Sequence, residues 1–518
     1  MLSPWQTLGW RGGIAALFAG ALTTYSMAPY NVWPLGIIAA LTLACLLQDL
    51  NAKQGLIRSC IFGIGMFGSG ASWVYVSIHD FGYTSAPLAA LLTSIFVIGL
   101  GLVFSLPFYF YCRFLSRHRL GFILGFSAIW VLGEWSRSWF LTGFPWLYLG
   151  YGHTQTWLAG WAPVFGVFGI SFFCVLSATL TSELIYETIR IFNPGKRPHA
   201  LYPISFAALL ATIWLSGWQL KDNNWGTHSV GEPVAVAIVQ PNIPLELKWN
   251  PFYQTNILEI LREQSDKHWD KQLIIWPEAA VPLMFSDAEE FIADITSQAN
   301  ASDTAVLTGI LYDDAKPNVF YNSIIGMGKA DGIYFKQRLV PFGEYVPLER
   351  WLRGIIAFFD LPNSIIFAGP SQQDLLHFGE YRISPSICYE IVYPDLVAAG
   401  AARAELLVTI SNDAWFGDSI GPLQHFQMAQ MRAIENRRYM IRATNTGLSG
   451  IITPHGQVSL LGTQFNRETI SEQVSLIEGT TPFTRWGSLP IVVFCLFSVI
   501  AIFIASIKKQ RNANAAKQ

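Results

Sequence analysis

Long apolar runs dominate the first 220 residues of the chain. Stretches of about 17–25 apolar residues are long enough to cross a lipid bilayer as helices. The predicted spans are 12–29, 32–48, 59–78, 86–111, 121–140, 162–188, 200–219 and 489–507. The pattern therefore predicts a membrane domain with seven transmembrane helices over residues 1–220, and an eighth transmembrane helix with a basic tail over 481–518.

The pattern changes over residues 221–480, where short apolar runs alternate with amphipathic stretches. The predicted strands are 233–240, 272–278, 304–311, 319–327, 381–390, 405–412, 439–447 and 449–456. The predicted helices are 254–269, 287–299, 392–402 and 422–438. Strands that alternate with helices are typical of a layered α/β domain, and about 250 residues are enough to bury a full core.

Composition and charge support this division. Apolar residues make up 52% of the chain and charged residues 13%, against about 25% charged residues in soluble proteins. Residues 1–220 hold only fifteen of the 68 charged residues. The formal net charge of −2 excludes a nucleic-acid partner that needs a large basic surface. The sequence thus predicts an integral membrane protein with a large water-exposed domain.

Lysine and arginine gather in alternate connections between the predicted spans. These connections hold Arg11, Lys53, Arg58, Arg113, Arg117, Arg119, Arg190, Lys196, Arg197, Lys508, Lys509, Arg511 and Lys517. The other connections contribute only Arg137. Because basic connections stay in the cytoplasm, we expect both termini there and residues 221–480 on the opposite side. Arg137 and the nearby Glu134 have two interpretations, an intramembrane functional pair or a pair that snorkels to the interface.

Cys388 is the only one of six cysteines in the predicted α/β domain, so a disulfide within that domain is excluded. An isolated cysteine is often a small core residue. Here, however, the run ISPSICYE ends a predicted strand just before a predicted helix. Such a turn presents a nucleophile outward and directs backbone N–H groups at a developing oxyanion. We therefore take Cys388 as a candidate nucleophile.

Two charged residues complete a candidate catalytic set. Glu278 follows the apolar run 273–276 and a proline, and Lys336 follows the short apolar run GIYF. Either residue taken singly is more often a solvated surface charge. A carboxylate, a lysine and a cysteine at the ends of neighbouring strands can nevertheless supply the base, the cation and the nucleophile of covalent catalysis.

Other polar positions in this domain have structural interpretations. We interpret His425, on an apolar helix, as a buried structural histidine, and Asn412 and Asp413 as caps of the helix that begins near Pro422. No cluster has the ligand spacing of a zinc site, and no glycine-rich phosphate loop follows a strand. The sequence predicts neither a metal nor a cofactor.

The candidate residues lie in runs that resemble the nitrilase superfamily, namely WPEAA at 276–280, the Lys336 region, ICYE at 387–390 and SNDAWFG at 411–417. This resemblance implies a Glu-Lys-Cys triad on an αββα sandwich. The runs KQRLVPFGEYVP at 336–347 and RATNTGLSGII at 442–452, together with the eight-span pattern, are similar to the apolipoprotein N-acyltransferase family.

The resemblance implies an enzyme of the bacterial inner membrane with a periplasmic catalytic domain. Its activity would be transfer of an acyl chain from a phospholipid, typically phosphatidylethanolamine, to the α-amino group of the diacylglyceryl-cysteine of a lipoprotein. The reaction would proceed by a ping-pong mechanism. By motif position, Glu278 would be the general base, Lys336 the oxyanion stabiliser and Cys388 the carrier of the acyl thioester. We expect a monomer.

The resemblance also implies supporting residues. Glu344, Tyr389 and Glu390 match positions beside the triad, and Trp249 matches a substrate-side tryptophan. The residues around Trp415 leave two interpretations for it, a side chain that fills the core or a position near the acyl pocket. The apolar stretch 351–361 has two interpretations, an amphipathic helix packed on the core or a mobile arm that dips into lipid.

Two other functions compete with this one. The first is a membrane-anchored amidase that uses the same triad with water as acceptor, although an anchor needs one span rather than eight. The second is a transporter with a catalytically inactive sensor domain, although the predicted spans hold few ionisable residues that would mark a transport pathway.

Overall fold

The computed structural model describes residues 9–192, 201–313, 318–345 and 366–515. The chain divides into two compact units. The helical unit comprises Met1–Tyr75, Ala86–Asn223 and Trp486–Gln518, and the sandwich unit comprises Val76–Ser85 and Asn224–Arg485. The predicted apolar stretch 351–361 lies outside the described residues.

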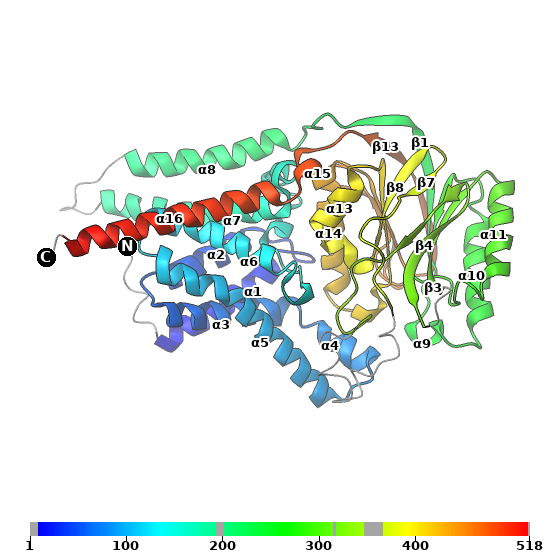
Figure 1. Cartoon of the computed structure of the whole chain (residues 1–518), viewed down its shortest axis with the longest axis horizontal. Coiled ribbons are helices and arrows are strands. Elements are labelled where there is room, and N and C mark those ends of the chain that lie inside the picture. Colours follow the sequence, from blue (N-terminus) through cyan, green and yellow to red (C-terminus); the bar gives the residue numbers. More distant parts are fainter. Residues whose placement is uncertain (1–8, 193–200, 314–317, 346–365, 516–518) are drawn as a thin grey trace. The chain divides into compact units, whose positions relative to one another are not determined.

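The helical unit has a helix at each of the eight predicted places (Figure 1). The main helices are α1 (Gly9–Tyr25), α2 (Pro34–Leu46), α3 (Ala52–Gly70), α5 (Ala86–Phe110), α6 (Phe126–Ser136), α7 (Ala162–Ile191), α8 (Leu201–Leu220) and α16 (Leu489–Ala515). Four segments of the described residues are long and apolar enough to cross a membrane, namely Ala86–Leu115, Trp157–Ile191, Leu201–Leu220 and Leu489–Lys508. A fifth results if Ala52–Gly70 and Val74–Phe81, bent by 62°, count as one span.

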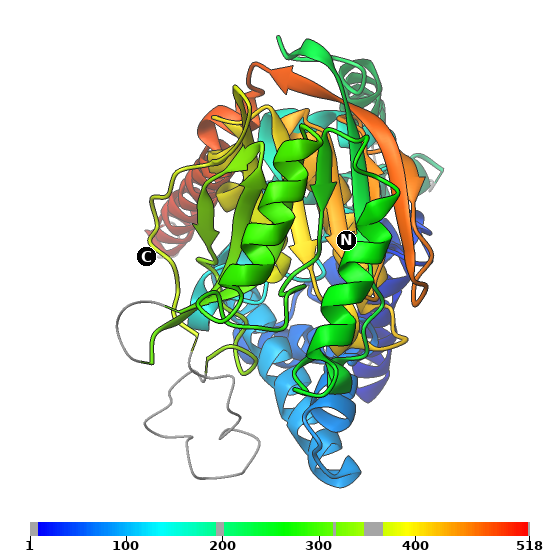
Figure 2. The same ribbon diagram turned by 90° about the vertical axis from the view of Figure 1, so that its right-hand side faces the viewer.

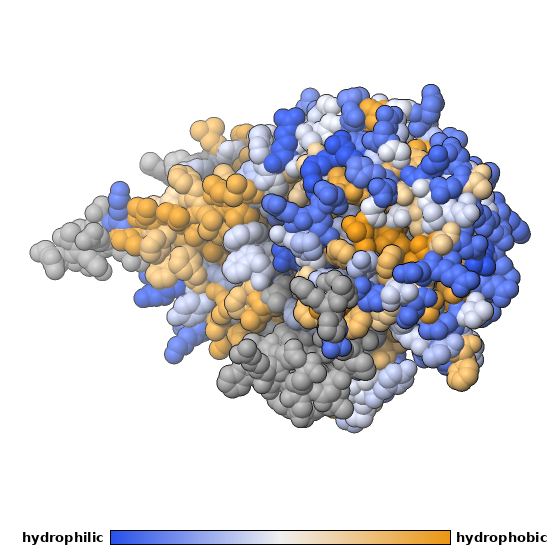
Figure 3. Space-filling model, turned by 45° about the vertical axis from the view of Figure 1, so that its right-hand side comes forward, coloured by the Kyte–Doolittle hydropathy of each residue, from blue (hydrophilic) through white to orange (hydrophobic). Residues whose placement is uncertain are grey.

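The surface of these helices is apolar (Figure 3). Exposed side chains include Ile95 and Leu102 on α5, Ile204 on α8, and Phe497 and Ile500 on α16. Apolar side chains in such numbers are unfavourable in water and favourable in the hydrocarbon core of a bilayer. The apolar helices are those of a membrane protein.

Of the two interpretations of Glu134 and Arg137, a pair that snorkels to the interface does not agree with the structure. Both side chains are buried, with 1% and 2% exposed. Glu134 Oε1 accepts hydrogen bonds from Trp130 Nε1 at 2.9 Å and from the Leu149 main-chain N–H at 2.8 Å, and Arg137 Nη1 donates to the Trp146 carbonyl oxygen at 3.0 Å. The pair therefore satisfies backbone groups of the irregular segment after α6, which a membrane protein must do internally.

The sandwich unit contains two sheets of mixed direction. The first has the order β13-β1-β2-β3-β4-β6, with β1 (His228–Gln240), β2 (Leu273–Ile275), β3 (Ala305–Asp313), β4 (Phe320–Gly328), β6 (Ile333–Phe335) and β13 (Glu468–Glu478). The second has the order β12-β11-β10-β9-β8-β7-β5, with β5 (Ala330–Asp331), β7 (Leu376–Phe378), β8 (Tyr381–Ile387), β9 (Leu406–Ser411), β10 (Met440–Thr444), β11 (Gly450–Ile452) and β12 (Val458–Leu461).

Helices cover the outer face of each sheet. Helices α10 (Gln254–Asp266) and α11 (Glu289–Ala301) lie across the first sheet (Figure 2), where Leu261 and Ile295 pack on Ile274 and Val306. Helices α13 (Pro394–Ala401) and α14 (Gly421–Asn436) lie on the far side of the second sheet (Figure 1). These layers are the αββα sandwich that the sequence predicts.

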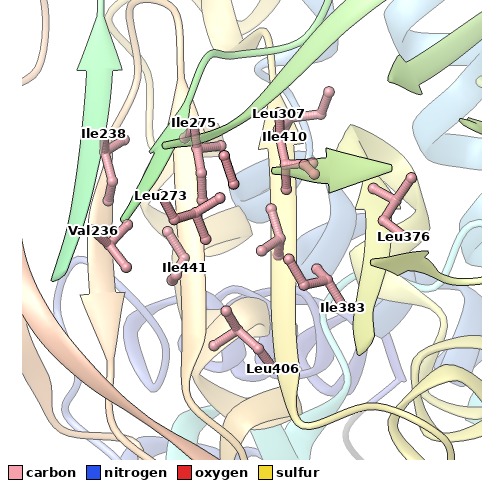
Figure 4. Packing of buried hydrophobic residues seen from close by; sticks show 14 of the residues in the cluster. Val236, Ile238, Leu273, Ile275, Leu307, Leu376, Ile383, Leu406, Ile410 and Ile441 are labelled. Atoms are coloured by element: carbon pink, nitrogen blue, oxygen red, sulfur yellow. The ribbon is translucent and has the colours of Figure 1, made fainter. Parts of the chain in front are cut away.

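The core between the two sheets is aliphatic (Figure 4). Ile238 and Ile275 of the first sheet and Ile410 and Ile441 of the second belong to this cluster and are fully buried. Burial of each such side chain contributes about 1.5–3 kcal/mol. The core fixes the two sheets against each other, and with them the strand ends that carry the polar residues described below.

The carboxyl ends of parallel strands bring those residues together. Strands β8, β9 and β10 run parallel to one another, as do β1, β2 and β3. Cys388 directly follows β8, Asn412 directly follows β9, and Glu278 lies three residues after β2. Parallel strands end at the same edge of a sheet, so Cys388 and Asn412 share one edge. The hydrogen bond from the Asn412 main-chain N–H to the Glu278 carboxylate places Glu278 beside them.

All eight predicted strands and all four predicted helices of this domain are present, with differences at their ends. The predicted strand 272–278 is only three residues long, and the predicted strand 381–390 ends at Ile387, where a 3₁₀ turn from Cys388 to Val392 begins. Five strands were not predicted, namely β5, β6, β7, β12 and β13.

Candidate active site

Glu278 is a buried carboxylate with three hydrogen-bonding or ionic partners. Its side chain is 9% exposed. Oε1 accepts a hydrogen bond from Asn322 Nδ2 at 2.8 Å and lies 3.3 Å from Lys336 Nζ, and Oε2 accepts from the Asn412 main-chain N–H at 2.8 Å. The main chain at Glu278 passes close to Gly309, where a Cβ atom would lie 2.7 Å from the Glu278 Cα atom. The carboxylate is thus fixed in position by groups from three separate segments.

Lys336 joins two carboxylates. It follows β6, its side chain is 1% exposed, and its Nζ atom lies 2.8 Å from Glu344 Oε1 as well as 3.3 Å from Glu278 Oε1. Asn322 Nδ2 donates to the same Glu344 oxygen at 3.0 Å, and the Val340 main-chain N–H donates to Glu344 Oε2 at 2.8 Å. Of the predicted site residues, Glu278, Lys336 and Glu344 therefore form one buried ionic cluster.

Cys388 occupies a strained position at the end of β8. Its φ angle is +51°, in the left-handed region that costs an ordinary residue about 1–2 kcal/mol. Its side chain is partly exposed, whereas the rest of the 3₁₀ turn is buried. A nucleophile on a sharp, strained turn after a strand is accessible to a substrate carbonyl.

Glu390 ties the cysteine turn to the lysine strand. This fully buried residue accepts hydrogen bonds at Oε1 from the Tyr334 hydroxyl at 3.0 Å and the Gln337 main-chain N–H at 2.6 Å. Its Oε2 accepts from the Ile387 main-chain N–H at 2.8 Å. Burial raises the pKa of Glu390 to about 7. The residue has a positioning role, because its partners lie directly beside Lys336 and Cys388.

A second buried network, formed by Arg442, Asp413 and His425, contacts the main chain at Cys388. Arg442 Nη2 donates to Asp413 Oδ2 at 2.6 Å, and His425 Nδ1 lies 3.1 Å from Asp413 Oδ1. His425 Nε2 lies 3.1 Å from the Cys388 carbonyl oxygen, which can only accept, so this nitrogen donates. The network confirms the structural interpretation of His425 and shows in addition that the histidine holds the nucleophile's backbone.

The prediction that Asn412 and Asp413 cap the following helix is wrong. Helix α14 begins at Gly421, and Ile420 occupies its N-cap position. Asn412 instead gives its main-chain N–H to Glu278, and Asp413 is paired with Arg442. Both residues are thus part of the site.

The charges of the cluster set its resting protonation. Burial alone would raise the pKa of Glu278, but Lys336, Asn322 and the other donors outweigh it and hold that pKa below its ordinary value. Burial would lower the pKa of Lys336, but Glu344 and Glu278 raise it above its ordinary value. Burial and the Glu278 carboxylate raise the pKa of the Cys388 thiol, against the opposing effect of Lys336. At neutral pH the site holds a carboxylate, an ammonium and a thiol.

This arrangement suits base-assisted nucleophilic attack. A thiol with a raised pKa is a poor nucleophile until a base removes its proton. Glu278, which is ionised and held in place, can accept that proton. Lys336 can stabilise the negative charge that then develops on sulfur or on a substrate oxygen.

The remaining predicted site residues lie at different depths. Tyr389 is 8% exposed and packs edge-on against Tyr393. Trp249 is 43% exposed. The carbonyl oxygen of Trp415 accepts a hydrogen bond from Ser77 Oγ at 2.7 Å, and its ring meets Phe81 edge-on. The described contacts do not join these three side chains to the ionic cluster.

Sequence reasoning missed two buried residues of the site. Asn322, on β4, bridges the two carboxylates, and Lys248 Nζ donates to the Glu278 carbonyl oxygen at 3.0 Å. For Asn322 the only signal was a polar residue inside an apolar run, and the sequence around Lys248 held none. Within the described part of the chain, no group of three or more His, Cys, Asp or Glu side chains could hold a metal ion.

Comparison with known proteins defines first the class of the domain. The family model of the carbon-nitrogen hydrolases matches residues 235–480, so the sandwich unit is a carbon-nitrogen hydrolase domain. The chain is also similar to the solved structure of Saccharomyces cerevisiae Nit3, a member of the nitrilase superfamily, with 16% sequence identity and a TM-score of 0.37. The match covers 48% of this chain and 91% of the Nit3 chain.

Comparison of the whole chain then defines its family. The family model of the apolipoprotein N-acyltransferase N-terminal domain matches residues 19–180. The apolipoprotein N-acyltransferase of Pseudomonas aeruginosa strain LESB58 is 45% identical over 489 residues, which is 93% of this chain and 94% of that protein. The apolipoprotein N-acyltransferase of Pseudomonas syringae pv. tomato is 42% identical over 94% of this chain and 96% of that protein. That of Methylococcus capsulatus is 37% identical over 97% of this chain and 97% of that protein. The chain belongs to the apolipoprotein N-acyltransferase family.

Proposed function

We propose that this membrane enzyme transfers an acyl chain from a phospholipid to the α-amino group of the N-terminal diacylglyceryl-cysteine of lipoproteins. The names of the relatives, which match nearly the whole chain, support an N-acyltransferase. The observation that carries the proposal is the buried cluster in which Lys336 contacts Glu278 and in which both charges act on the Cys388 thiol.

In the first half-reaction, Glu278 accepts the proton of Cys388 as sulfur attacks the ester carbonyl of the phospholipid. A bond forms between sulfur and the carbonyl carbon, and the ester C–O bond breaks. Glu278 returns the proton to the leaving oxygen, so that a lysophospholipid departs and an acyl thioester remains on Cys388. Lys336 and the Tyr389 main-chain N–H stabilise the oxyanion, and one such donor is worth about 3–4 kcal/mol.

In the second half-reaction, the α-amino group of the lipoprotein attacks the thioester. A C–N bond forms and the C–S bond breaks, Glu278 accepts the proton of the amine, and the thiolate recovers a proton. The reference pKa of an α-amino group is about 7.7–8.0, so an appreciable neutral fraction exists near neutral pH. The reaction is thus a ping-pong exchange through Cys388, with Glu344 and Glu390 holding Lys336 and the cysteine turn.

The helical unit gives this chemistry its place at the membrane. We propose eight spans, with both termini in the cytoplasm and the catalytic domain in the periplasm of the bacterial inner membrane. Support comes from the alternation of basic connections along the sequence. Alkaline phosphatase fused after residue 480 should then be active, and the same enzyme fused to the C-terminus should be inactive.

The substrates follow from the same proposal. The donor is a membrane phospholipid, with phosphatidylethanolamine as the expected headgroup, and the enzyme acts as a monomer. The exposed side chain of Trp249 is available to substrate, and Trp415 is a candidate for the acyl side of the site. Domain boundaries at residues 220 and 480 belong to the same proposal.

Labelled phospholipid tests the central step. Purified enzyme is incubated with phospholipid labelled in its acyl chain, and mass spectrometry is used to find the label on the peptide that contains Cys388. We expect a label that hydroxylamine removes and that a diacylglyceryl-cysteine peptide accepts. Cys388→Ala should carry none, and Lys329→Met, at an exposed lysine paired with Asp303, should behave as wild type. Transfer to water alone would indicate an amidase, and an unlabelled enzyme would refute the proposal.

A further inference from the structure

Lys248 is a buried lysine that the proposed mechanism does not use. It ends the short helix α9 (Leu245–Lys248), it is 3% exposed, and its Nζ atom donates to the Glu278 carbonyl oxygen at 3.0 Å. Among the described residues, Lys248 and Lys336 are the only buried lysines. Because an ammonium is costly to bury without compensation, the position of Lys248 beside the proposed base needs a physical reason.

The charge balance of the ionic cluster supplies that reason. Lys336 is the only ammonium in the cluster described so far, and it lies 3.3 Å from Glu278 and 2.8 Å from Glu344. With a neutral thiol at Cys388, one ammonium and two carboxylates leave one uncompensated negative charge. An uncompensated negative charge favours protonation of a buried carboxylate such as Glu278, and a protonated Glu278 could not accept the proton of Cys388.

The other charged groups nearby do not remove this excess. Glu390, whose pKa burial raises to about 7, is partly ionised at neutral pH and adds to it. Asp413, which also acts on the Cys388 thiol, is paired with Arg442 at 2.6 Å. Burial and Arg442 lower the pKa of His425, so this residue is neutral at pH 7. Glu246 lies on the same short helix as Lys248 but is exposed. Lys248 acts electrostatically on both Glu278 and Cys388.

We propose that Lys248 is a positioning residue of this active site, whose ammonium balances the second carboxylate and keeps Glu278 ionised for its role as the base. The inference rests on the proposed function, in which Glu278 accepts the proton of Cys388. Two further observations agree with it. Lys248 is among the groups that lower the pKa of Glu278, and burial lowers the pKa of Lys248 itself to about 8, so that it is mostly charged at neutral pH.

The test is the pH dependence of the first half-reaction alone. Release of lysophospholipid in a single turnover is measured from about pH 4 to pH 8. No lipoprotein acceptor is added, so its titrating amine does not affect the profile. The rate falls on acidification as Glu278 becomes protonated. Loss of a neighbouring positive charge raises the pKa of a carboxyl, so in Lys248→Met we expect this fall at a pH about one unit higher, which is about a tenfold lower rate at the acid end.

A second variant separates charge from hydrogen bonding. Lys248→Gln is neutral but keeps an N–H donor for the Glu278 carbonyl oxygen, and it remains informative if Lys248→Met does not fold. We expect Lys248→Gln to show the same shift, Lys248→Arg to keep the wild-type position, and the exposed control Lys329→Met to be unchanged.

Three outcomes would overturn the inference. A wild-type profile in Lys248→Gln would show that only the hydrogen bond matters. A lower rate without a shift in any neutral variant would show that Lys248 merely fills space. These two outcomes can be interpreted only if the wild-type enzyme itself releases lysophospholipid. A wild type that releases none would overturn the proposed function itself, and this inference with it.

Discussion

The left-handed conformation of Cys388 makes a prediction about stability that is independent of any substrate. At a φ angle of +51°, a residue with a Cβ atom is disfavoured by about 1–2 kcal/mol, whereas glycine adopts this conformation freely. Replacement of Cys388 by alanine and by glycine removes the sulfur in both cases. The difference between the two variants therefore isolates the cost of the Cβ atom at this position.

The difference in stability between Cys388→Gly and Cys388→Ala is a balance of two free-energy contributions. Glycine relieves about 1–2 kcal/mol of conformational energy in the folded state, but its freedom in the unfolded chain costs about 0.5–1 kcal/mol. We expect Cys388→Gly to be more stable than Cys388→Ala by about 0.5–1 kcal/mol. For a folding unit of about 150–250 residues, that corresponds to a Tm about 1–4 °C higher.

The assay is thermal unfolding of the full-length protein in detergent at one fixed heating rate, since unfolding of membrane proteins is commonly irreversible. Ala399, exposed on helix α13, provides the matched control. The same alanine-to-glycine change there should destabilise by about 1 kcal/mol, because glycine is a poor helix former. If Cys388→Ala melts at or above Cys388→Gly while Ala399→Gly melts lower, the backbone at Cys388 is not strained and this reasoning fails.

Three further predictions concern the residues around Glu278. Asn322→Leu removes two hydrogen bonds to ionised acceptors, each worth about 1.5–3 kcal/mol, so release of lysophospholipid at pH 7 should fall at least about tenfold, and an unchanged rate would contradict the bridging role. Gly309→Ala places a Cβ atom 2.7 Å from the Glu278 Cα atom; circular dichroism should show a folded protein, acylation should be lost, and full activity would show that the backbone can move aside. Burial would raise the pKa of Asp413, but Arg442 holds it well below its ordinary value, so the pair stabilises the fold above pH about 4 and less as the pH falls. Asp413→Asn should lower stability at pH 7 by about 3–5 kcal/mol and flatten the loss of stability on acidification, which urea unfolding at several pH values measures; a variant as stable as wild type would refute the buried pair.

The sequence was sufficient to find the residues that end strands. Glu278, Lys336 and Cys388 each follow an apolar run, and a polar residue at such a position marks the place where a buried strand reaches the edge of its sheet. The ends of parallel strands share an edge of their sheet, which is the case for Cys388 after β8 and Asn412 after β9. Lys336 follows β6, a strand that was not predicted and that pairs antiparallel with β4. The polar residue at the end of an apolar run made each position a candidate, and the resemblance of the surrounding motifs supplied its role.

Residues whose importance depends on strand pairing could not be found in this way. Asn322 lies inside β4, and only the pairing of β4 with β6 places its amide between two carboxylates. Lys248 lies in a four-residue helix with a glutamate two positions before it, so its local pattern is that of a solvated surface. Burial of these side chains is a property of the tertiary structure.

The strands that were missed have a similar explanation. Strands β5, β6 and β7 have two or three residues each, too few to show the alternation that identifies a strand. Strand β13 is long, but it lies at the edge of its sheet and carries Glu468, Glu472 and Glu478. Charged side chains protect an edge strand from pairing with other chains, and they also hide its apolar pattern.

The resting state of the site reconciles two conflicting demands on Cys388. It is the only cysteine of the sandwich unit, and a partly exposed thiolate is prone to oxidation. Burial and the Glu278 carboxylate raise its pKa, so sulfur rests as the less reactive thiol. Glu278, kept ionised by Lys336, can remove the proton when a carbonyl carbon is present to receive the electron pair. The same carboxylate thus suppresses the free thiolate and enables the attack, because in the transition state the negative charge moves away from Glu278 and toward Lys336 and the oxyanion.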